Sequence, residues 1–260
     1  MLYEKLYKAQ RVVRSLYWLV MNYHSFKSEL SHNFGVKSLA PYKVINWHNG
    51  AYYFRAICQD KEIFIKTDYV YGLLENEIVT YKILNKCNGM DNVFIQPLFF
   101  DDNAHNFIAY PFIKDKTLQS MFCDSQVSSI RKIKIIQEFI NLLDCLFENG
   151  IVNRDFKADN FFVTSDDRLV SIDYTFAISP LKSQLLKDLD LESEGNLKIL
   201  KNLGTSSQVY PLHWDDAHGI LMLLESLERS SGICLAGHLT GIRGRIGRLP
   251  YIKLIQTKLY

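Results

Sequence analysis

The residues best suited to chemistry lie in one short stretch, 151–160, and at a fixed distance after it. The stretch contains an acid, a base and an amide, Asp155, Lys157 and Asn160, and a second carboxylate, Asp173, follows two short apolar runs. A tight hairpin formed by those runs would return the chain and bring Asn160 beside Asp173. A carboxylate and an amide oxygen together suit a hard cation such as Mg²⁺, which leaves Asp155 to act as a base.

The elements that must position this loop can be predicted from periodicity. A helix at 128–149 is indicated by apolar residues that recur on one face, and the pair Asn149-Gly150 is a good helix end. Two short strands are expected after the loop, and a further helix after those, at 161–164, 169–172 and 215–228. The loop therefore connects a long helix to a hairpin.

The first part of the chain has a different pattern, with one long helix followed by short runs rich in β-branched and aromatic residues. The expected elements are a helix at 3–30, a three-stranded meander at 43–47, 52–58 and 62–66, a helix at 72–86, and strands at 93–100 and 106–112. Five strands with one helix inserted after the third make a small α+β lobe.

The loop resembles the catalytic loop and the metal-binding segment of the protein-kinase superfamily, whose patterns are H-R-D-x-x-x-x-N and D-F-G. Arg154, Asp155, Lys157 and Asn160 match the first pattern, and Asp173 stands 13 residues after Asn160, a spacing typical of the family. The resemblance implies catalytic roles for Arg154, Asp155 and Lys157, and Mg²⁺ binding by Asn160 and Asp173.

The segment 62–66 resembles the third-strand V-A-I-K of the same superfamily, whose lysine holds the α- and β-phosphates of ATP. Lys66 is the matching lysine, and Glu77 in the next helix fits the glutamate that pairs with it. Glu75 is the competitor. Glu77 is preferred because Thr80, at i+3, and further apolar residues at i+4 and i+7 share its helical face.

The remaining nucleotide-binding parts occur in the expected order along the chain. The run 108–113 resembles the fifth strand and hinge, with Tyr110 at the gatekeeper position. The resemblance implies that adenine bonds to the Pro111 carbonyl and the Ile113 amide. Of the glycine-rich loop only Gly50 remains, which predicts a weaker backbone cradle for the phosphates.

Several positions depart from the family pattern. Asn153 replaces the usual histidine, and Tyr174-Thr175 replaces Phe-Gly, which makes a flipping activation segment less favourable. Asp215 or Asp216 could be the buried aspartate of the following large helix. The histidines near these aspartates could in principle complete a metal site, but helix N-capping explains the aspartates better.

The resemblance implies a bilobal, protein-kinase-like α+β fold. We expect an N-terminal helical extension at 1–41, a five-stranded N-lobe with one helix at 42–112, and a short, mainly helical C-lobe with a basic tail at 113–260. The implied activity is transfer of the γ-phosphate of ATP, with Mg²⁺, to a hydroxyl group. The acceptor favoured by the short C-lobe is a sugar or a cell-envelope glycolipid of the lipopolysaccharide-core type. The alternatives are a Ser/Thr protein kinase and a non-catalytic pseudokinase that binds a partner.

Composition and charge limit the environment of the protein. Five scattered cysteines without a C-x-x-C pair and the lack of a long apolar run predict a cytoplasmic protein. Residues 1–43 hold seven lysines and arginines against two acids, and residues 241–260 hold five against none. These basic ends could meet an anionic membrane surface at the inner membrane face, although solvated helix faces also explain them. We expect no nucleic-acid partner, since the glycine- and arginine-rich stretch after residue 240 is typical of a turn-rich tail.

Overall fold

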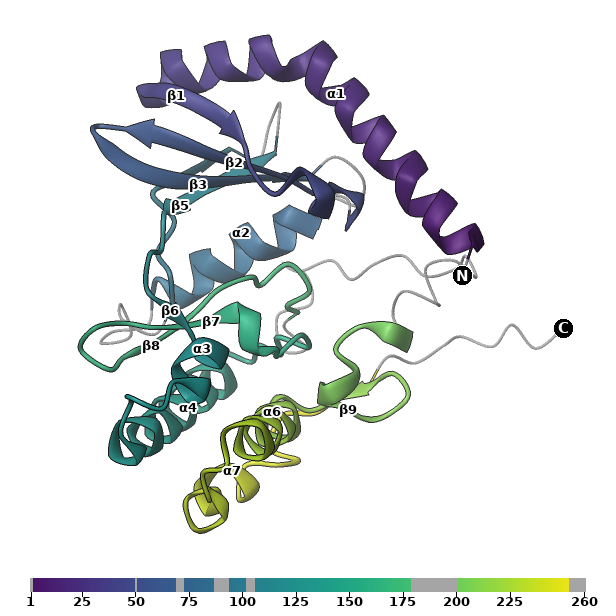
Figure 1. Cartoon of the computed structure of the whole chain (residues 1–260). Coiled ribbons are helices and arrows are strands. Elements are labelled where there is room, and N and C mark those ends of the chain that lie inside the picture. Colours follow the sequence, from purple (N-terminus) through teal and green to yellow (C-terminus); the bar gives the residue numbers. More distant parts are fainter. Residues whose placement is uncertain are drawn as a thin grey trace, which may run out of the picture. The chain divides into compact units, whose positions relative to one another are not determined.

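The computed structural model describes residues 2–49, 51–68, 73–86, 94–101, 106–178 and 201–252 of the 260-residue chain (Figure 1). The chain divides into two compact units, 1–78 with 96–113 and 79–95 with 114–260. The named strands pair antiparallel, and helices alternate with these small sheets along the chain. The fold class is therefore α+β, as predicted from the sequence.

The first unit is built on a five-stranded sheet with the strand order β1-β2-β3-β5-β4. Its elements are α1 (Leu2–Phe34), β1 (Val36–Pro41), the 3-10 helix η1 (Val44–Asn49), β2 (Ala51–Cys58), β3 (Lys61–Asp68), β4 (Phe99–Asp101) and β5 (Phe107–Pro111). Helix α2 (Leu73–Leu84) begins in this unit and ends in the second.

Helix α1 covers one face of this sheet. Side chains alternate between the two faces of a strand, so Tyr52 and Phe54 of β2 point to the same face. Trp18 of α1 stacks on Tyr52 with ring centroids 4.3 Å apart, and Phe26 lies 5.6 Å from Phe54. The resulting aromatic core also includes Leu30 of α1, which is fully buried. The other face of the sheet carries Lys66 and the groups described below.

The start of the sheet differs from the sequence prediction. Residues 43–47, expected as the first strand, belong to the connection that contains η1, and the first strand is β1 at Val36–Pro41. The chain turns at Lys43, which has φ +47°, and the Asn46 amide donates to the Lys43 carbonyl at 2.8 Å. Trp47 is fully buried and donates from Nε1 to the Tyr42 carbonyl at 3.0 Å. Burial of one tryptophan, rather than strand pairing, explains the apolar pattern here.

The strand predicted at 93–100 is also wrong in its extent. In the described part of this segment, 94–100, the sheet strand begins at Phe99, the first residue of β4 (Phe99–Asp101), and Pro97 stands two residues before it. Proline has no N–H to give to a ladder, which confines it to strand starts and edges. Phe94, on the other side of this proline, instead bridges in parallel to Ser171 of the second unit.

The described residues of the second unit form two small three-stranded sheets, with orders β6-β7-β8 and β11-β10-β9. Its elements are β6 (Lys116–Thr117), α3 (Leu118–Cys123), α4 (Ser129–Glu148), the 3-10 helix η2 (Ala158–Asn160), β7 (Phe161–Val163), β8 (Leu169–Ser171), the 3-10 helix η4 (Thr205–Ser207), β9 (Gln208–Tyr210), β10 (His213–Trp214), α6 (Asp216–Ser231), the 3-10 helix η5 (Ala236–His238), α7 (Thr240–Arg243) and β11 (Tyr251–Ile252). The long helix α4, the hairpin β7–β8 and helix α6 confirm the predictions at 128–149, 161–172 and 215–228, within one to three residues at their ends.

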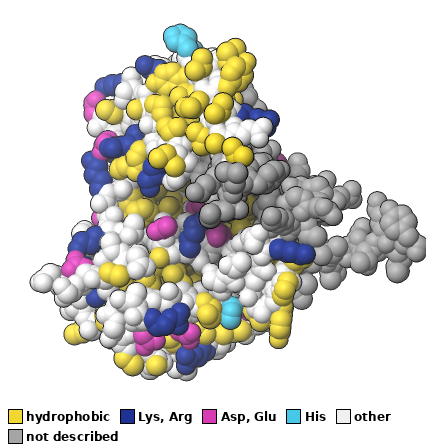
Figure 2. Space-filling view, turned by 45° about the vertical axis from the view of Figure 1, so that its right-hand side comes forward, with side chains coloured by type: hydrophobic (Ala, Val, Ile, Leu, Met, Phe, Trp, Pro, Cys, Tyr) yellow, Lys and Arg dark blue, Asp and Glu magenta, His cyan; other side chains and the backbone are white. Residues whose placement is uncertain are grey.

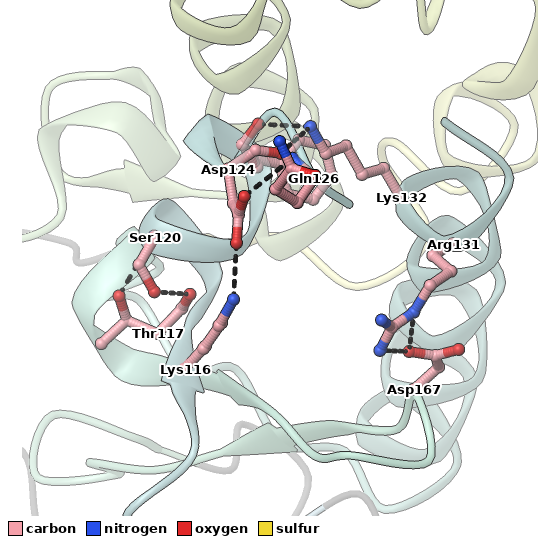
Figure 3. Close-up of polar contacts among 9 residues, drawn as sticks. Lys116, Thr117, Ser120, Asp124, Gln126, Arg131, Lys132 and Asp167 are labelled. Atoms are coloured by element: carbon pink, nitrogen blue, oxygen red, sulfur yellow. Dashed lines mark hydrogen bonds and ion pairs between the residues drawn. The ribbon is translucent and has the colours of Figure 1, made fainter. Parts of the chain in front are cut away.

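A buried lysine joins the ends of α3 and α4 (Figure 3). Lys132 of α4 donates from Nζ to the carbonyls of Phe122 and Asp124, at 2.7 and 3.0 Å. These carbonyls lie at the end of α3, where backbone acceptors lack helical partners. Lys116 bonds to the Asp124 carboxylate at 2.5 Å and is the main cause of a lowered pKa for that group. Two lysines thus fix the connection between α3 and α4, one through backbone carbonyls and one through a carboxylate.

Candidate active site

The first group of candidate residues is a buried ion pair on the sheet of the first unit. Lys66 of β3 lies 2.7 Å from Glu77 of α2, measured from Nζ to Oε2, and both side chains are buried. Glu75, the competing partner in the sequence, is exposed. The helical face argument therefore selected the glutamate that the structure pairs with Lys66.

Glu77 is held from a second side by Tyr110 of β5. Tyr110 donates its hydroxyl to Glu77 Oε1 at 2.6 Å, and the contact is buried. Lys66 and Tyr110 share the face of the sheet opposite the α1 core, because Lys66 pairs with Ile108 in the ladder and Tyr110 lies two residues on. The sequence placed Tyr110 near this group but gave no sign that its hydroxyl would reach the glutamate.

The strand end after Tyr110 presents two backbone groups away from β3. The Phe112 amide donates to the Glu62 carbonyl at 3.1 Å, and alternate residues of an antiparallel strand face opposite ways. The Pro111 carbonyl and the Ile113 amide are the groups that the sequence assigned to adenine, and this alternation turns both away from β3. The missing N–H of Pro111 therefore removes no bond to that strand. Gly50, the remaining candidate of this unit, lies outside the described residues.

The loop of the second unit is held from beneath by Asp216, the first residue of α6. Its Oδ2 accepts from the Asn153 amide at 2.6 Å and its Oδ1 from the Arg154 amide at 3.1 Å. Burial raises the pKa of Asp216 to about 7, against the lowering effect of these two bonds. Asp215 instead caps α6 by accepting from the His218 amide at 2.9 Å. Both aspartates left open by the sequence are buried, and Asp216 is the one that bonds to the loop.

Arg154, which the sequence groups with the catalytic residues, is buried at the base of this loop. It has φ +71°, its Nε donates to the Phe176 carbonyl at 2.8 Å, and its guanidinium lies 5.2 Å from the ring of Trp214. These contacts tie the loop to the segment after β8 and to β10. The contacts of Arg154 thus hold the loop in place.

Gly204 supports the same loop and escaped the sequence prediction. Its φ is +50°, and a Cβ added there would lie 1.6 Å from the Arg154 carbonyl oxygen. Only glycine fits, because any side chain would meet backbone in a conformation that already disfavours one. No local pattern in the sequence marks Gly204, because the group that it approaches lies 50 residues earlier in the chain.

Asp155 lies at the centre of a small network within the loop. Its amide donates to Asn153 Oδ1 at 3.0 Å, and its carbonyl accepts from Asn160 Nδ2 at 3.0 Å. Lys157 Nζ lies 2.7 Å from Asp155 Oδ2, and about half of the lysine side chain is exposed. Asn153, in the place of the usual histidine, thus bonds to the backbone of the aspartate.

Asp173 follows the hairpin, and the backbone brings it next to Asn160. The Ile172 amide donates to the Asn160 carbonyl at 2.9 Å, which continues the pairing of β7 with β8. Asp173 has φ +64°, and its Oδ1 accepts from Thr175 Oγ1 at 2.5 Å. The expectation that the hairpin sets these two residues side by side is met at the level of the backbone.

Other candidates from the sequence have structural partners. Arg245 bonds from Nε to Asp144 Oδ1 at 2.8 Å, which raises the pKa of the arginine and lowers that of the aspartate. Arg248 also lies near Asp144, and Arg243 near Glu225. Among the described residues, no three histidine, cysteine or acidic side chains form a metal cluster. Ion pairs thus account for much of the basic stretch after residue 240.

Comparisons with known proteins give no relative from which roles for these residues could be taken. Neither the scan against protein-family models nor the search of curated proteins finds a match for this chain. Within the described ranges, no helix combines the length and apolarity that a membrane span requires.

Proposed function

We propose that this protein is an ATP-dependent phosphotransferase with a bilobal, protein-kinase-like fold. The observation that carries the proposal is the buried Lys66–Glu77 pair, in which Glu77 also accepts a hydrogen bond from Tyr110. Buried ion pairs seldom add net stability, since desolvation offsets most of the attraction. A lysine held in this way is a fixed cation on a sheet, which is what positioning of the α- and β-phosphates of ATP requires.

The loop of the second unit supports the same proposal. Two successive backbone amides, of Asn153 and Arg154, bond to one buried carboxylate, Asp216. This support fixes the residue that comes next, Asp155, without using its side chain. A group that must orient an acceptor hydroxyl needs such a rigid base, because small displacements weaken positioning.

The donor set of the loop fits a magnesium ion. Asn160 uses Nδ2 to bond to the Asp155 carbonyl, which leaves the amide oxygen as the end available to a cation. Asp173 supplies a carboxylate next to Asn160, because it follows Ile172, whose amide bonds to the Asn160 carbonyl. Oxygen ligands of this kind are those that Mg²⁺ prefers. When bound, Mg²⁺ would bridge phosphate oxygens and offset their negative charge.

The chain's own residues then have distinct tasks in the proposed transfer. Lys66, oriented by Glu77, would bind the α- and β-phosphates. Asp155 would orient the acceptor hydroxyl and take its proton as the acceptor oxygen bonds to the γ-phosphorus and the bond to the ADP oxygen breaks. Lys157 would bind the transferred phosphoryl group and offset its charge. The Pro111 carbonyl and Ile113 amide would bond to adenine.

The acceptor proposed is the hydroxyl of a sugar or an envelope glycolipid. The excess of basic residues at 1–43 favours this acceptor, because it suits an anionic glycolipid. A Ser/Thr protein kinase is the second candidate, favoured by the contact between Lys157 and Asp155. A pseudokinase is the third, favoured by the connection at 42–49, where a buried tryptophan replaces glycines.

The test is transfer of labelled γ-phosphate from Mg²⁺-ATP in a host lysate, with products separated into protein, lipid-linked and water-soluble fractions. Asp155→Ala is the comparison, and its rate is expected to fall by about 10²–10⁴ because the proton acceptor is removed. Asp159→Ala is the matched control, because Asp159 is an exposed aspartate of the same loop. Label in the lipid or soluble fraction supports the favoured acceptor, and label in protein supports the second candidate. Equal labelling by the wild type and Asp155→Ala would reject the enzyme.

A further inference from the structure

The outer side of helix α1 carries a continuous apolar stripe. Large apolar side chains recur there at three-, four- and seven-residue spacing, which places them on one side of a helix. They are 43 to 79% exposed, and they are Leu6, Val13, Leu16, Tyr17, Val20 and Met21. Figure 2 shows hydrophobic side chains gathered at the top of the view, over the region of α1. Exposed apolar patches of this extent usually mark an interaction surface.

This stripe is separate from the face that α1 uses to cover the sheet. Ser15 and Phe26 are fully buried on the sheet side, and Trp18 stacks there on Tyr52. On a helical wheel, Ser15 lies opposite Leu6, nine residues or two and a half turns away, and nearly opposite Tyr17, two residues or about 200° away. The helix therefore has two apolar faces, of which the sheet covers one.

The charge of the same segment indicates what kind of surface fits the stripe. Between Leu6 and Met21 the sequence holds three basic residues, Lys8, Arg11 and Arg14, and no acid. The segment therefore has a net charge of +3, and two copies of it would repel each other, which disfavours self-pairing. An anionic surface would instead be complementary to both the apolar and the basic character.

We propose that the outer face of α1 docks on an anionic lipid surface. The helix would lie in the plane of the interface, with the stripe at the boundary between headgroups and acyl chains. The segment from Leu6 to Met21 spans roughly 22 Å along the helix axis, at ~1.5 Å per residue. The stripe is convex and carried by a single helix, a shape that a bilayer surface accepts without a matching groove. This inference does not depend on the proposed phosphotransferase activity.

The test is sedimentation of the full chain with vesicles of phosphatidylcholine plus phosphatidylglycerol, compared with vesicles of phosphatidylcholine alone. Binding is expected for the anionic vesicles only and should weaken as salt rises. The double variant Val13→Glu with Val20→Glu should bind at least about tenfold more weakly, since both charges enter the apolar boundary. Ile130→Glu is the matched control, because Ile130 on α4 is 79% exposed, as Val20 is. This control should bind like the wild type.

Three results would overturn the proposal. The first is no binding to anionic vesicles, and the second is equal binding by the wild type and the double variant. The third is a dimer in solution that the double variant converts to a monomer, which would make the stripe an interface between copies of the chain. All substituted side chains are exposed, so circular dichroism and the unfolding midpoint should match the wild type and separate loss of docking from loss of fold.

Discussion

The two groups of candidate residues are held in different ways. In the first unit, the Lys66–Glu77–Tyr110 group consists of side chains that bond directly to one another. In the second unit, the loop around Asp155 is held mainly through its backbone, by Asp216, Gly204 and Arg154. In the first group, a substitution that removes one bond to Glu77 leaves the other in place. In the second, the Asp155 loop needs the close approach of Gly204 to the Arg154 carbonyl, which a side chain at position 204 would block. Substitutions should therefore have unequal effects in the two units.

The largest effect is expected from Gly204→Ala. The added Cβ would meet the Arg154 carbonyl oxygen at 1.6 Å, in a backbone conformation with φ +50°. The loop must shift, and we expect a loss of roughly 3 kcal/mol or more of unfolding free energy. Gly232→Ala is the matched control, since Gly232 has φ +70° but no neighbour within 4 Å of the added atom. It should lose only ~1–2 kcal/mol. Urea unfolding measures the free energy of unfolding of both variants. Equal losses would show that the Cβ added at position 204 does not clash with the Arg154 carbonyl.

A smaller, pH-dependent effect is expected from Asp216→Asn. The pKa of Asp216 is raised to about 7 in the folded protein, well above 3.8, so the folded state binds a proton that the unfolded chain releases. The contribution of this group to stability is complete below about pH 4 and falls as pH rises toward 7. The stability of the wild type relative to Asp216→Asn should therefore fall between pH 5.5 and 7, by at most about 1.4 kcal/mol per pH unit. Above about pH 8 the difference should stay constant.

Denaturant unfolding of both proteins across this pH range measures the difference directly. The comparison removes titrations that the two proteins share, because only the group at position 216 differs. A difference that does not change with pH would mean that Asp216 keeps an ordinary pKa, with its two amide bonds outweighing burial.

The smallest effect is expected from Tyr110→Phe. The change removes one bond to Glu77 Oε1 and leaves the Lys66 bond to Oε2 in place. Stability should fall by about 1 kcal/mol. If the proposed function holds, the KM for ATP should rise a few-fold with little change in kcat. A large fall in kcat would instead show that Tyr110, rather than Lys66, sets the position of the glutamate.

The features that could be predicted from the sequence are those that depend on local patterns. The helix at 128–149 and its Asn149-Gly150 end, the hairpin after the loop, and the choice of Glu77 over Glu75 all follow from periodicity or from residues a few positions apart. These features form from short-range contacts, so a single sequence contains their signal.

The sequence did not predict what distant contacts control. The apolar residues around Trp47 have a strand-like pattern, but the segment forms a 3-10 helix in which Trp47 is fully buried. Gly204 approaches a carbonyl 50 residues earlier in the chain, and Tyr110 reaches Glu77 across 33 residues. No periodic pattern marks such pairs, because each depends on how separate elements pack.

The three tryptophans give each unit its own optical reporter. Trp18 and Trp47 belong to the first unit, whereas Trp214 belongs to the second, where it is buried and its indole donates to the Leu203 carbonyl at 2.9 Å. In a protein with Trp18→Phe and Trp47→Phe, Trp214 would be the only source of tryptophan emission, and its ring lies against the Arg154 guanidinium. Its emission would then report on the base of the Asp155 loop, so that nucleotide or magnesium could be titrated and the loop observed without an activity assay.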